Sequence, residues 1–528
     1  MKSIFKSVML ITVFSMLTRM LGFFFRIFLS RTIGAEALGM YQVALSVFMV
    51  LLTIVSSGFT LIISRTTASL RVGTNKKQIG SLVTSSMLVG LVVSVLLCLI
   101  VFVFRNLFAN LFTDQNCINI LIVLLPSLVF SSIYSVFRGA MWGDNNFFGL
   151  CVTELFEQII KIVVCVLLLA SGMSALQNAL SVAWAFTISC FASAILVVLL
   201  YFFYGGNMCK PTKIYRQVVR QSIPITGVRI TGSLVQPLIA LILPAKLIAA
   251  GYTSNQAMSL YGIAVGMTLP FLYLPSSIIG SLATALVPDI SMAMAENDKK
   301  HIETRVQSSI VFAVFVSFLI VPVFMAIGDK FGLFIYNNVL SGTLLQYSAW
   351  IMIPMGITNI TSAILNSIGL EVKSFVNYLV GGVFMFLCVL FLPEYIGISA
   401  LIVGMGISAL FSASLNLRMI KKKLKIKINI FKNIVKMILL AIPTMATTSF
   451  VSALLGHFLP VVIDLTISAA LGIIMFVVLC EIFKVINLSV YFVKFKEKFS
   501  GKSFVAKIKN KKKHVKRSKK MQKNKHFC

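Results

Sequence analysis

Long apolar stretches separated by short polar connections recur along the chain up to about residue 486. Each stretch holds about 20 residues or more, enough for an α-helix to cross a hydrocarbon core of roughly 30 Å. The pattern predicts fourteen membrane-spanning helices, with ends defined to within about 2 to 4 residues. The predicted spans are 4–30, 39–64, 79–104, 118–141, 150–170, 179–204, 222–249, 259–287, 306–328, 343–367, 374–393, 396–417, 434–457 and 460–486.

Lysine and arginine gather in alternate connections. Clusters such as Lys76 with Lys77 follow the second, sixth, eighth and twelfth predicted spans. The connections on the other side are nearly free of charge, with Asp329 and Lys330 among the few ionic residues. Because cytoplasmic connections carry the excess of basic residues, both termini are expected to be cytoplasmic and the number of spans to be even.

Two echoes between the halves of the chain indicate an internal duplication. Arg19 and Gly22 in the first span are matched by Arg229 and Gly232 in the seventh, and similar polar turns precede spans 5 and 11. Internal repeats place a transport site at the interface between halves. The expected organisation is an N-terminal six-helix lobe (1–204), a basic cytoplasmic linker (205–221), a C-terminal six-helix lobe (222–418), two additional transmembrane helices (434–487) and a basic disordered cytoplasmic tail (488–528).

The composition agrees with an all-α polytopic membrane protein. Of the 528 residues, 58% are hydrophobic and 12% are charged, whereas about a quarter of residues are charged in soluble domains. No connection is long enough to fold as an independent domain, so any site is expected within the helix bundle. The nine cysteines include no C-x-x-C pair, and neither a disulfide framework nor a metal site is predicted.

The formal net charge of +32 is only partly due to the tail, which holds fifteen basic residues against Glu497 alone. Such a tail is expected to bind anionic membrane lipid, at about 1 kcal/mol per basic residue near the surface. A nucleic-acid partner is not expected, because the membrane surface already offers a partner of opposite charge.

Two arginines in the first predicted span are the main candidates for chemistry. Ser15, Arg19, Gly22 and Arg26 share one stripe of the helix. An arginine at mid-membrane costs about 2.5 to 3.5 kcal/mol even on the lenient insertion scale, so the stripe is expected to face protein, water or an anionic ligand. The alternative is that the two side chains extend to the lipid headgroups.

The seventh predicted span repeats this character. Arg229 and Gln236 belong to a polar stripe, and Pro224, Pro237 and Pro244 interrupt the hydrogen-bond pattern of the helix. Proline removes a backbone hydrogen bond, so this span is expected to bend, either as a fixed kink or as a hinge. Arg229 and Gln236 are therefore candidate substrate-binding residues.

The fifth predicted span carries Glu154, Glu157 and Lys161 on one face. A glutamate four residues before a lysine forms a favourable pair, which also neutralises two charges that are costly in a bilayer. Arg138, at the end of the fourth span, is expected to pair with one of these acids. A structural ion-pair role and a substrate-lining role both stay open for Arg138, Glu154, Glu157 and Lys161.

Several kinds of catalytic or energising motif are missing. The sequence has no glycine-rich loop ending in GKS or GKT, so ATP-driven transport by this chain is not predicted. The four histidines lie in connections, at a span end or in the tail, away from candidate carboxylates, and a catalytic histidine is not expected. No cofactor is predicted, and a coupling ion is left unassigned.

Short motifs distributed over spans 1 to 12 resemble a known group of transporters. They are Leu21–Phe23, Arg26–Glu36, Gly39–Gln42, Phe137–Gly139, Glu157–Gln158, Ser222–Thr226, Tyr261–Gly262, Gly266–Met267 with Pro270, and Leu286–Ser291. As a set they resemble the stage V sporulation protein B group of polysaccharide and lipid-linked oligosaccharide transporters. That group is akin to the peptidoglycan precursor flippase MurJ, in the superfamily that also holds the multidrug and toxin extrusion transporters.

The resemblance implies two lobes around a central cavity, alternating access, and an undecaprenyl-pyrophosphate-linked substrate such as lipid II. Arg19 matches a cavity arginine of MurJ, and Arg26 lies one residue beyond the second arginine of that helix. The eighth span holds no arginine, and Arg229 is the candidate to supply that charge from the seventh. The expected function is a flippase, not an enzyme, acting as a monomer in the bacterial cytoplasmic membrane in peptidoglycan or polysaccharide biosynthesis, cell shape or sporulation.

Three other functions compete with this expectation. A cation-coupled multidrug antiporter of the same superfamily should place carboxylates where cationic drugs bind, but the first span holds two arginines and no acid. A membrane glycosyltransferase or ligase should present acids or histidines on an external connection, and only isolated acids occur there. A non-transporting scaffold would leave Arg19 and Arg229 without a role.

Overall fold

The computed structural model describes residues 2–72, 76–170, 172–211, 214–296, 298–426 and 430–485, and none of these residues lies in a β-strand. The helices of the first part of the chain are α1 (Lys2–Val72), α2 (Lys76–Val103), α3 (Arg105–Ala109), α4 (Cys117–Leu124), α5 (Pro126–Gly143), α6 (Phe147–Leu168) and α7 (Ala175–Phe203). The next are α8 (Ile214–Ser233), α9 (Val235–Ala249), α10 (Ser254–Tyr261), the π-helix η1 (Gly262–Thr268), α11 (Leu269–Leu272), α12 (Leu274–Ala295) and α13 (Lys299–Tyr336). They are followed by α14 (Val339–Ser348), the 3₁₀ helix η2 (Ala349–Ile351), α15 (Met352–Ser367), α16 (Glu371–Phe391), α17 (Pro393–Ile396), α18 (Ser399–Leu424), α19 (Phe431–Leu455) and α20 (Val461–Ile482).

The predicted all-α membrane architecture is confirmed, whereas the predicted number of spans is not. Eleven of the described helices are long and apolar enough to cross a membrane, and twelve if the bent pair Ser254–Leu272 and Leu274–Ala283 forms one span. The stretch Leu10–Arg71 counts once among them, although it is 62 residues long. Fourteen spans therefore stay a prediction.

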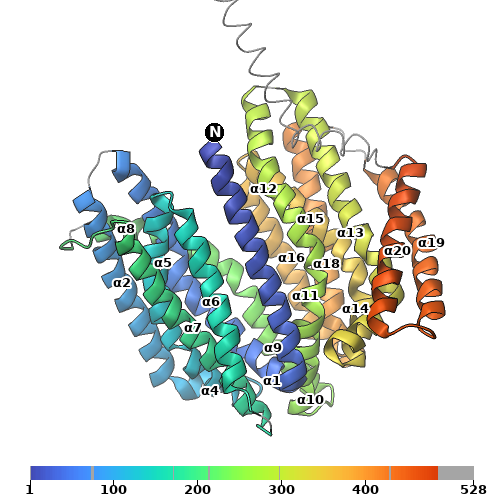
Figure 1. Ribbon diagram of the computed structural model, residues 1–528, viewed down its shortest axis with the longest axis horizontal. Coiled ribbons are helices and arrows are strands. Elements are labelled where there is room, and N and C mark those ends of the chain that lie inside the picture. The colour runs from blue at the N-terminus through green and yellow to red at the C-terminus, as the bar shows by residue number, and fades with distance from the viewer. Residues whose placement is uncertain are drawn as a thin grey trace, which may run out of the picture. The chain divides into compact units, whose positions relative to one another are not determined.

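Gly34 divides α1 into two segments. Its φ of 78° and ψ of 174° are non-helical, in a region of backbone space that only glycine adopts without steric cost. The segment before Gly34 carries Arg19 and Arg26, and the segment after it packs against α5 and α8. Figure 1 shows the first segment running from the N-terminus to the turn near the α1 label.

The predicted seventh span is two helices, α8 and α9, which meet at Leu234. Pro237 lies three residues later and has no N–H to donate to the carbonyl of Ser233. Leu234 keeps helical φ and ψ of −71° and −24°, and residues 218–249 still form one apolar span. Both parts pack against α1, and in addition α8 packs against α2 while α9 packs against α10 and α16.

The core of the first part of the chain lies between the second segment of α1 and helices α2, α5 and α7. Phe137 of α5 packs on Tyr201 of α7, with ring centroids 5.1 Å apart. The buried cluster is formed by Phe59, Ile62, Ile63, Leu82, Val83, Val136, Phe137, Ala140, Met141, Leu150, Val197, Tyr201 and Val218. Because Val218 belongs to α8, the first half of the seventh predicted span shares this core. The two-lobe division with its boundary at residue 222 stays a prediction.

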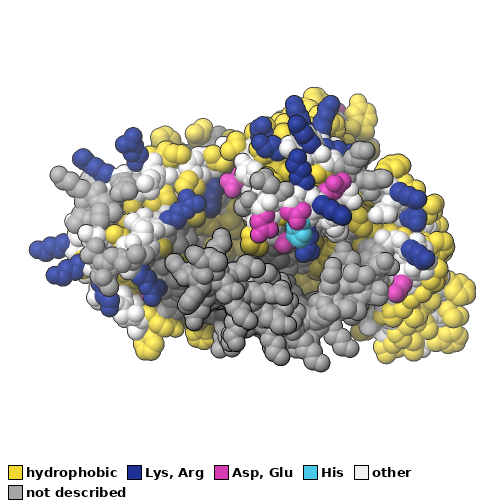
Figure 2. All heavy atoms as spheres, turned by 90° about the horizontal axis from the view of Figure 1, so that it is seen from above, with side chains coloured by type: hydrophobic (Ala, Val, Ile, Leu, Met, Phe, Trp, Pro, Cys, Tyr) yellow, Lys and Arg dark blue, Asp and Glu magenta, His cyan; other side chains and the backbone are white. Residues whose placement is uncertain are grey.

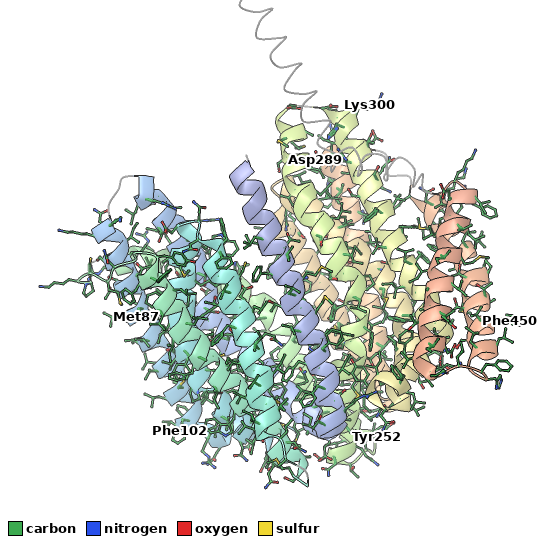
Figure 3. All side chains as sticks on the ribbon, viewed as in Figure 1. Met87, Phe102, Tyr252, Asp289, Lys300 and Phe450 are labelled. Carbon is green, nitrogen blue, oxygen red and sulfur yellow. The ribbon has the colours of Figure 1, made fainter. Side chains whose placement is uncertain are left out.

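By their internal contacts, the described residues up to 426 form one compact unit, and the described residues 430–485 belong to a second. Figure 3 places Asp289 and Lys300 at one end of the first unit, and Phe102 and Tyr252 at the opposite end. Figure 2 looks onto the end with Lys300 and shows many Lys and Arg side chains there. We call this the basic end.

In the second unit, α19 and α20 form a helical pair. Lys436 Nζ donates a hydrogen bond to the Phe483 carbonyl at 3.3 Å. The Asp464 carboxylate is 2% exposed and accepts hydrogen bonds from Ser452 at 3.1 Å and Ser468 at 2.9 Å. The predicted tail, 488–528, lies outside the described residues.

Candidate functional site

The first segment of α1 lies between helices of the two halves of the chain. Phe14 packs edge-to-face on Phe148 of α6, with ring centroids 6.2 Å apart. A Cβ on Gly22 would lie 3.6 Å from Gln158 Nε2, also in α6. On another side of the segment, Phe23 packs on Phe271 of α11, with centroids 5.3 Å apart. The segment therefore contacts α6 along one side and α11 along another.

Arg19 and Arg26 lie between these two contact lines. Both side chains are exposed, and among the described residues neither forms an ion pair with a carboxylate. The segment also has exposed apolar side chains, such as Met16, Met20 and Phe24 at 64%, 47% and 59% exposure. At 100° per residue, these three are centred about 110° around the helix axis from the mean direction of the two arginines. The arginines thus lie on a different side of the helix from most of its exposed apolar side chains.

The charge of Arg26 reaches aromatic residues from both halves of the chain. It acts electrostatically on the hydroxyls of Tyr41 in α1, Tyr273 between α11 and α12, and Tyr336 in α13. Arg26 lies eight residues before Gly34, about 12 Å along the helix axis. Arg26 therefore lies about two helical turns before the kink at Gly34.

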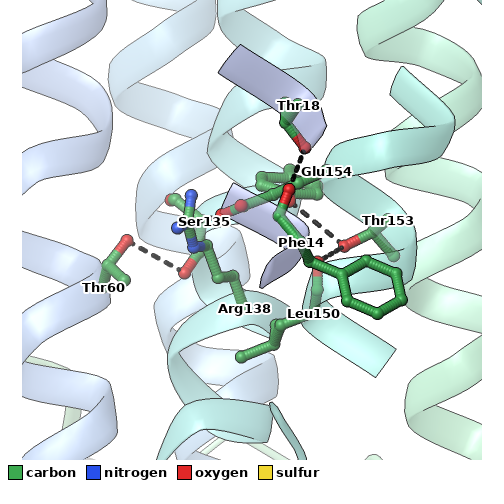
Figure 4. Close-up of polar contacts among 9 residues, drawn as sticks. Phe14, Thr18, Thr60, Ser135, Arg138, Leu150, Thr153 and Glu154 are labelled. Atoms are coloured by element: carbon green, nitrogen blue, oxygen red, sulfur yellow. Dashed lines mark hydrogen bonds and ion pairs between the residues drawn. The ribbon is translucent and has the colours of Figure 1, made fainter. Parts of the chain in front are cut away.

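Arg138 and Glu154 form the ion pair that the sequence predicted. Figure 4 shows the two side chains facing each other between α5 and α6, beside Phe14 and Thr18 of α1. Their side chains are 33% and 31% exposed, and the Arg138 guanidinium lies 5.9 Å from the centroid of the Tyr134 ring. The charge of Arg138 is thus already compensated by a fixed carboxylate, which favours the structural role.

Lys161 is held by three neighbours. Its Nζ lies 3.8 Å from Glu157 Oε1, donates a hydrogen bond to Gln158 Oε1 at 3.4 Å, and lies 5.1 Å from the centroid of the Phe186 ring. The predicted pair of Glu157 and Lys161 is confirmed. Because Gln158 also faces Gly22, this polar group adjoins the α1 stripe one turn from Arg26.

The polar stripe predicted along the seventh span is divided by packing. Ser222 is buried where α8 meets Gly58 of α1, and Gly232 faces the ring of Phe375 in α16. Arg229 and Gln236 are exposed. That Arg229 and Gln236 lie beside the α1 arginines stays a prediction.

Arg31 is a residue whose role sequence reasoning missed. Its Nε donates to the Ile335 carbonyl at 2.6 Å, its Nη2 donates to the Phe334 carbonyl, and its guanidinium lies 6.0 Å from the Phe334 ring centroid. These carbonyls end α13, where the helix dipole attracts a cation. Arg31 thereby ties α1 to α13. The sequence signal was its place just before Gly34, but the partner helix could not be read from it.

Within the described ranges, no group of three or more His, Cys, Asp or Glu side chains could hold a metal ion. The acids of the site, Glu154 and Glu157, are instead paired with Arg138 and Lys161. What the arrangement offers chemically is positive charge without a fixed counter-ion, at Arg19 and Arg26.

The family model described as polysaccharide biosynthesis protein matches residues 4–294. The chain belongs to this family. The match covers the α1 stripe, the ion pairs of α5 and α6, and the span formed by α8 and α9.

Individual relatives extend the likeness. Stage V sporulation protein B of Bacillus subtilis (strain 168) is 25% identical over 394 residues, which are 71% of this chain and 75% of that protein. The solved structure of the lipid II flippase MurJ in an inward closed conformation has a TM-score of 0.72 at 15% identity, covering 90% of this chain and 98% of its own. An inward-facing multidrug resistance MATE family transporter of the MOP superfamily has a TM-score of 0.65 at 17% identity, covering 77% and 95%.

These structural likenesses identify the fold. The chain is a multi-pass membrane protein with the fold of MOP superfamily transporters.

Proposed function

We propose that this protein is a flippase that moves an undecaprenyl-pyrophosphate-linked peptidoglycan precursor, or a related lipid-linked polysaccharide unit, from the inner to the outer leaflet by alternating access. The observation that carries the proposal is the pair Arg19 and Arg26, exposed between α6 and α11 without a carboxylate partner among the described residues. The names of the family and of the MurJ structure point to the same chemistry.

The physical argument concerns the headgroup. A pyrophosphate cannot cross hydrocarbon unaided, because an unpaired charge there loses its hydration. Guanidinium groups bind phosphate oxygens through paired hydrogen bonds and stay charged at any physiological pH. Arg19 and Arg26 are seven residues apart, about 10 Å along the helix, and could hold a pyrophosphate at two successive depths. The lipid tail would stay in the bilayer between helices.

The same reasoning disfavours a cation-coupled multidrug antiporter. Such a protein needs carboxylates that are free to bind cations, whereas Glu154 and Glu157 are held by Arg138 and Lys161. A positive pair on α1 would repel a cationic drug.

The wider setting belongs to the same proposal. The protein would act as a monomer in the bacterial cytoplasmic membrane with both termini cytoplasmic, so that the basic end faces the cytoplasm. The C-terminal tail would bind anionic lipid there. The role would be in peptidoglycan or polysaccharide biosynthesis, in cell shape or sporulation, with no cofactor.

The test uses cells that depend on this protein. We expect Arg19→Ala and Arg26→Ala each to lower the lipid II accessible on the outer face about tenfold or more, because a hydrogen-bonded charge contributes about 1.5 to 3 kcal/mol. Arg65→Ala removes an exposed arginine elsewhere on α1 and serves as the control, with membrane abundance measured for each variant. Normal accessibility in both site variants would contradict the proposal.

A further inference from the structure

Gln158 of α6 is a buried polar residue beside the α1 stripe, and the function proposed above assigns it no role. Its side chain belongs to a residue that is 9% exposed. A Cβ on Gly22 would lie 3.6 Å from Gln158 Nε2, so the amide lies against α1 at the level of Gly22. Because buried polar groups in proteins nearly always have a hydrogen-bond partner, the partners of each end of this amide indicate what it does.

The orientation of the amide is fixed by Lys161. Lys161 Nζ donates a hydrogen bond to Gln158 Oε1 at 3.4 Å, and an ammonium group has no lone pair, so only the carbonyl end of the amide can face it. Lys161 is itself held by Glu157 Oε1 at 3.8 Å and by the Phe186 ring, whose centroid is 5.1 Å away. The NH₂ end of Gln158 is therefore directed to the side of Gly22.

The NH₂ end of Gln158 has no acceptor among the described residues. Five other polar atoms of the described chain lack a partner and are also fully enclosed. Gln158 Nε2 is not one of them, so it keeps contact with the space outside the packed interior. An unsatisfied donor in a largely buried side chain is costly, and an acceptor arriving from that space would remove the cost.

The amide lies on the arginine side of α1. At 100° per residue, Gly22 points about 50° from the mean direction of Arg19 and Arg26, away from the exposed apolar side chains of the segment. Along the helix axis, Gly22 is about 4.5 Å from the level of Arg19 and about 6 Å from the level of Arg26. Glycine has no side chain, so α1 itself places none over the amide at this level.

We infer that Gln158 is a third contact for the anionic headgroup, donating a hydrogen bond from Nε2 to a phosphate oxygen between the levels of Arg19 and Arg26. This inference deepens the function proposed above and rests on it. A pyrophosphate held by either arginine would reach the amide, because Gly22 lies within about 6 Å of both levels along the axis. Gln158 would thus stay bound to the headgroup while it passes from one arginine to the other.

The test measures the binding of undecaprenyl pyrophosphate to the purified full-length protein in phosphatidylcholine nanodiscs. Gln158→Leu removes the donor and should weaken binding about fivefold, the effect of one lost hydrogen bond. Gln158→Glu keeps an acceptor for Lys161 but replaces the donor by a carboxylate oxygen. It should weaken binding about 50-fold or more, because this carboxylate repels the phosphate.

The order of the two variants separates a substrate contact from a packing role. If Gln158 served only to accept the hydrogen bond from Lys161, Gln158→Glu would retain that bond and bind better than Gln158→Leu. Gln115→Glu introduces the same charge in an exposed connection before α4 and should leave the affinity unchanged. The melting temperature of each variant shows that it is folded.

The double variant Arg19→Ala, Arg26→Ala, measured alongside, separates this inference from the proposed function. Weak binding by the double variant with wild-type binding by both Gln158 variants would overturn the inference and leave the flippase proposal standing. Better binding by Gln158→Glu than by Gln158→Leu would also overturn it. A wild-type protein that shows no saturable binding of undecaprenyl pyrophosphate would overturn both.

Discussion

At the scale of single residues, the charged groups of the bundle fall into two classes. Arg138 and Lys161 have fixed carboxylate partners, whereas Arg19 and Arg26 have none among the described residues. Both classes are costly in a bilayer. The paired residues lower that cost within the protein, and the unpaired arginines keep the capacity to bind an external anion.

The first prediction concerns the pair of Arg138 and Glu154. A double-mutant cycle with Arg138→Gln and Glu154→Gln should give a coupling free energy of about 1 to 3 kcal/mol, because removing one partner leaves the other charge unpaired and partly buried. The measurement is the unfolding free energy in detergent.

Arg71 and Asp144 provide the matched control. Their side chains are 50% and 47% exposed, against 33% and 31% for Arg138 and Glu154. A more solvated pair should couple by less than about 1 kcal/mol. Equal coupling in the two cycles would contradict a burial-dependent role for the pair in α5 and α6.

Contacts between residues close in sequence could be predicted, whereas contacts between residues far apart in sequence could not. The pair of Glu157 and Lys161 follows from helical spacing, and Arg138 with Glu154 from adjacent span ends. The approach of Gly22 to Gln158 and the bond from Arg31 to the end of α13 join helices far apart in sequence. Nothing local specifies such pairs, because the helix order within a bundle is a tertiary property.

At the scale of elements, the closest packing between the two halves is between backbones. A Cβ on Gly39 of α1 would lie 1.9 Å from the Met258 carbonyl oxygen of α10, and one on Gly262 of η1 would lie 2.0 Å from the Ala35 oxygen. Neither backbone can move aside as a flexible side chain would. The contact follows Gly34 in α1, so it joins the halves close to the turn between the two α1 segments.

We expect Gly39→Ala to weaken this contact by about 1 to 3 kcal/mol, which shifts the population toward states in which the halves are apart there by about 5- to 150-fold. The reporter is a Ser30→Cys side chain in a background without native cysteines. Ser30 is 3% exposed, so a cysteine there should react slowly with a membrane-impermeant thiol reagent until the contact opens.

Gly280→Ala is the control, because a Cβ there meets nothing within 4 Å. It should leave the reaction rate of Ser30→Cys unchanged, while Gly39→Ala should raise it. Identical rates in the two variants would show that the glycine contact does not govern opening.

Element boundaries could be predicted where one residue dictates them. Pro237 marks the junction of α8 and α9, and the connection 31–38 between the first two predicted spans contains the kink at Gly34. The packing of α8 on α1 and α2 could not be predicted, because its stripe of Ser222 and Arg229 does not specify which neighbour covers it.

At the scale of the whole molecule, hydropathy and charge alternation were enough to predict an all-α membrane protein, and the motifs were enough to predict its family. The number of spans depends on how α1 and the charged helix α6 are counted, so fourteen stays a prediction.

The central claim is that Arg19 and Arg26 receive an anionic lipid headgroup in transit. The most direct measurement is the transbilayer movement of lipid II in liposomes containing the purified protein. The wild-type protein and the Arg65→Ala control should move it at similar rates. The double variant Arg19→Ala, Arg26→Ala should approach the rate of protein-free liposomes. Movement by the double variant at the wild-type rate would contradict the account.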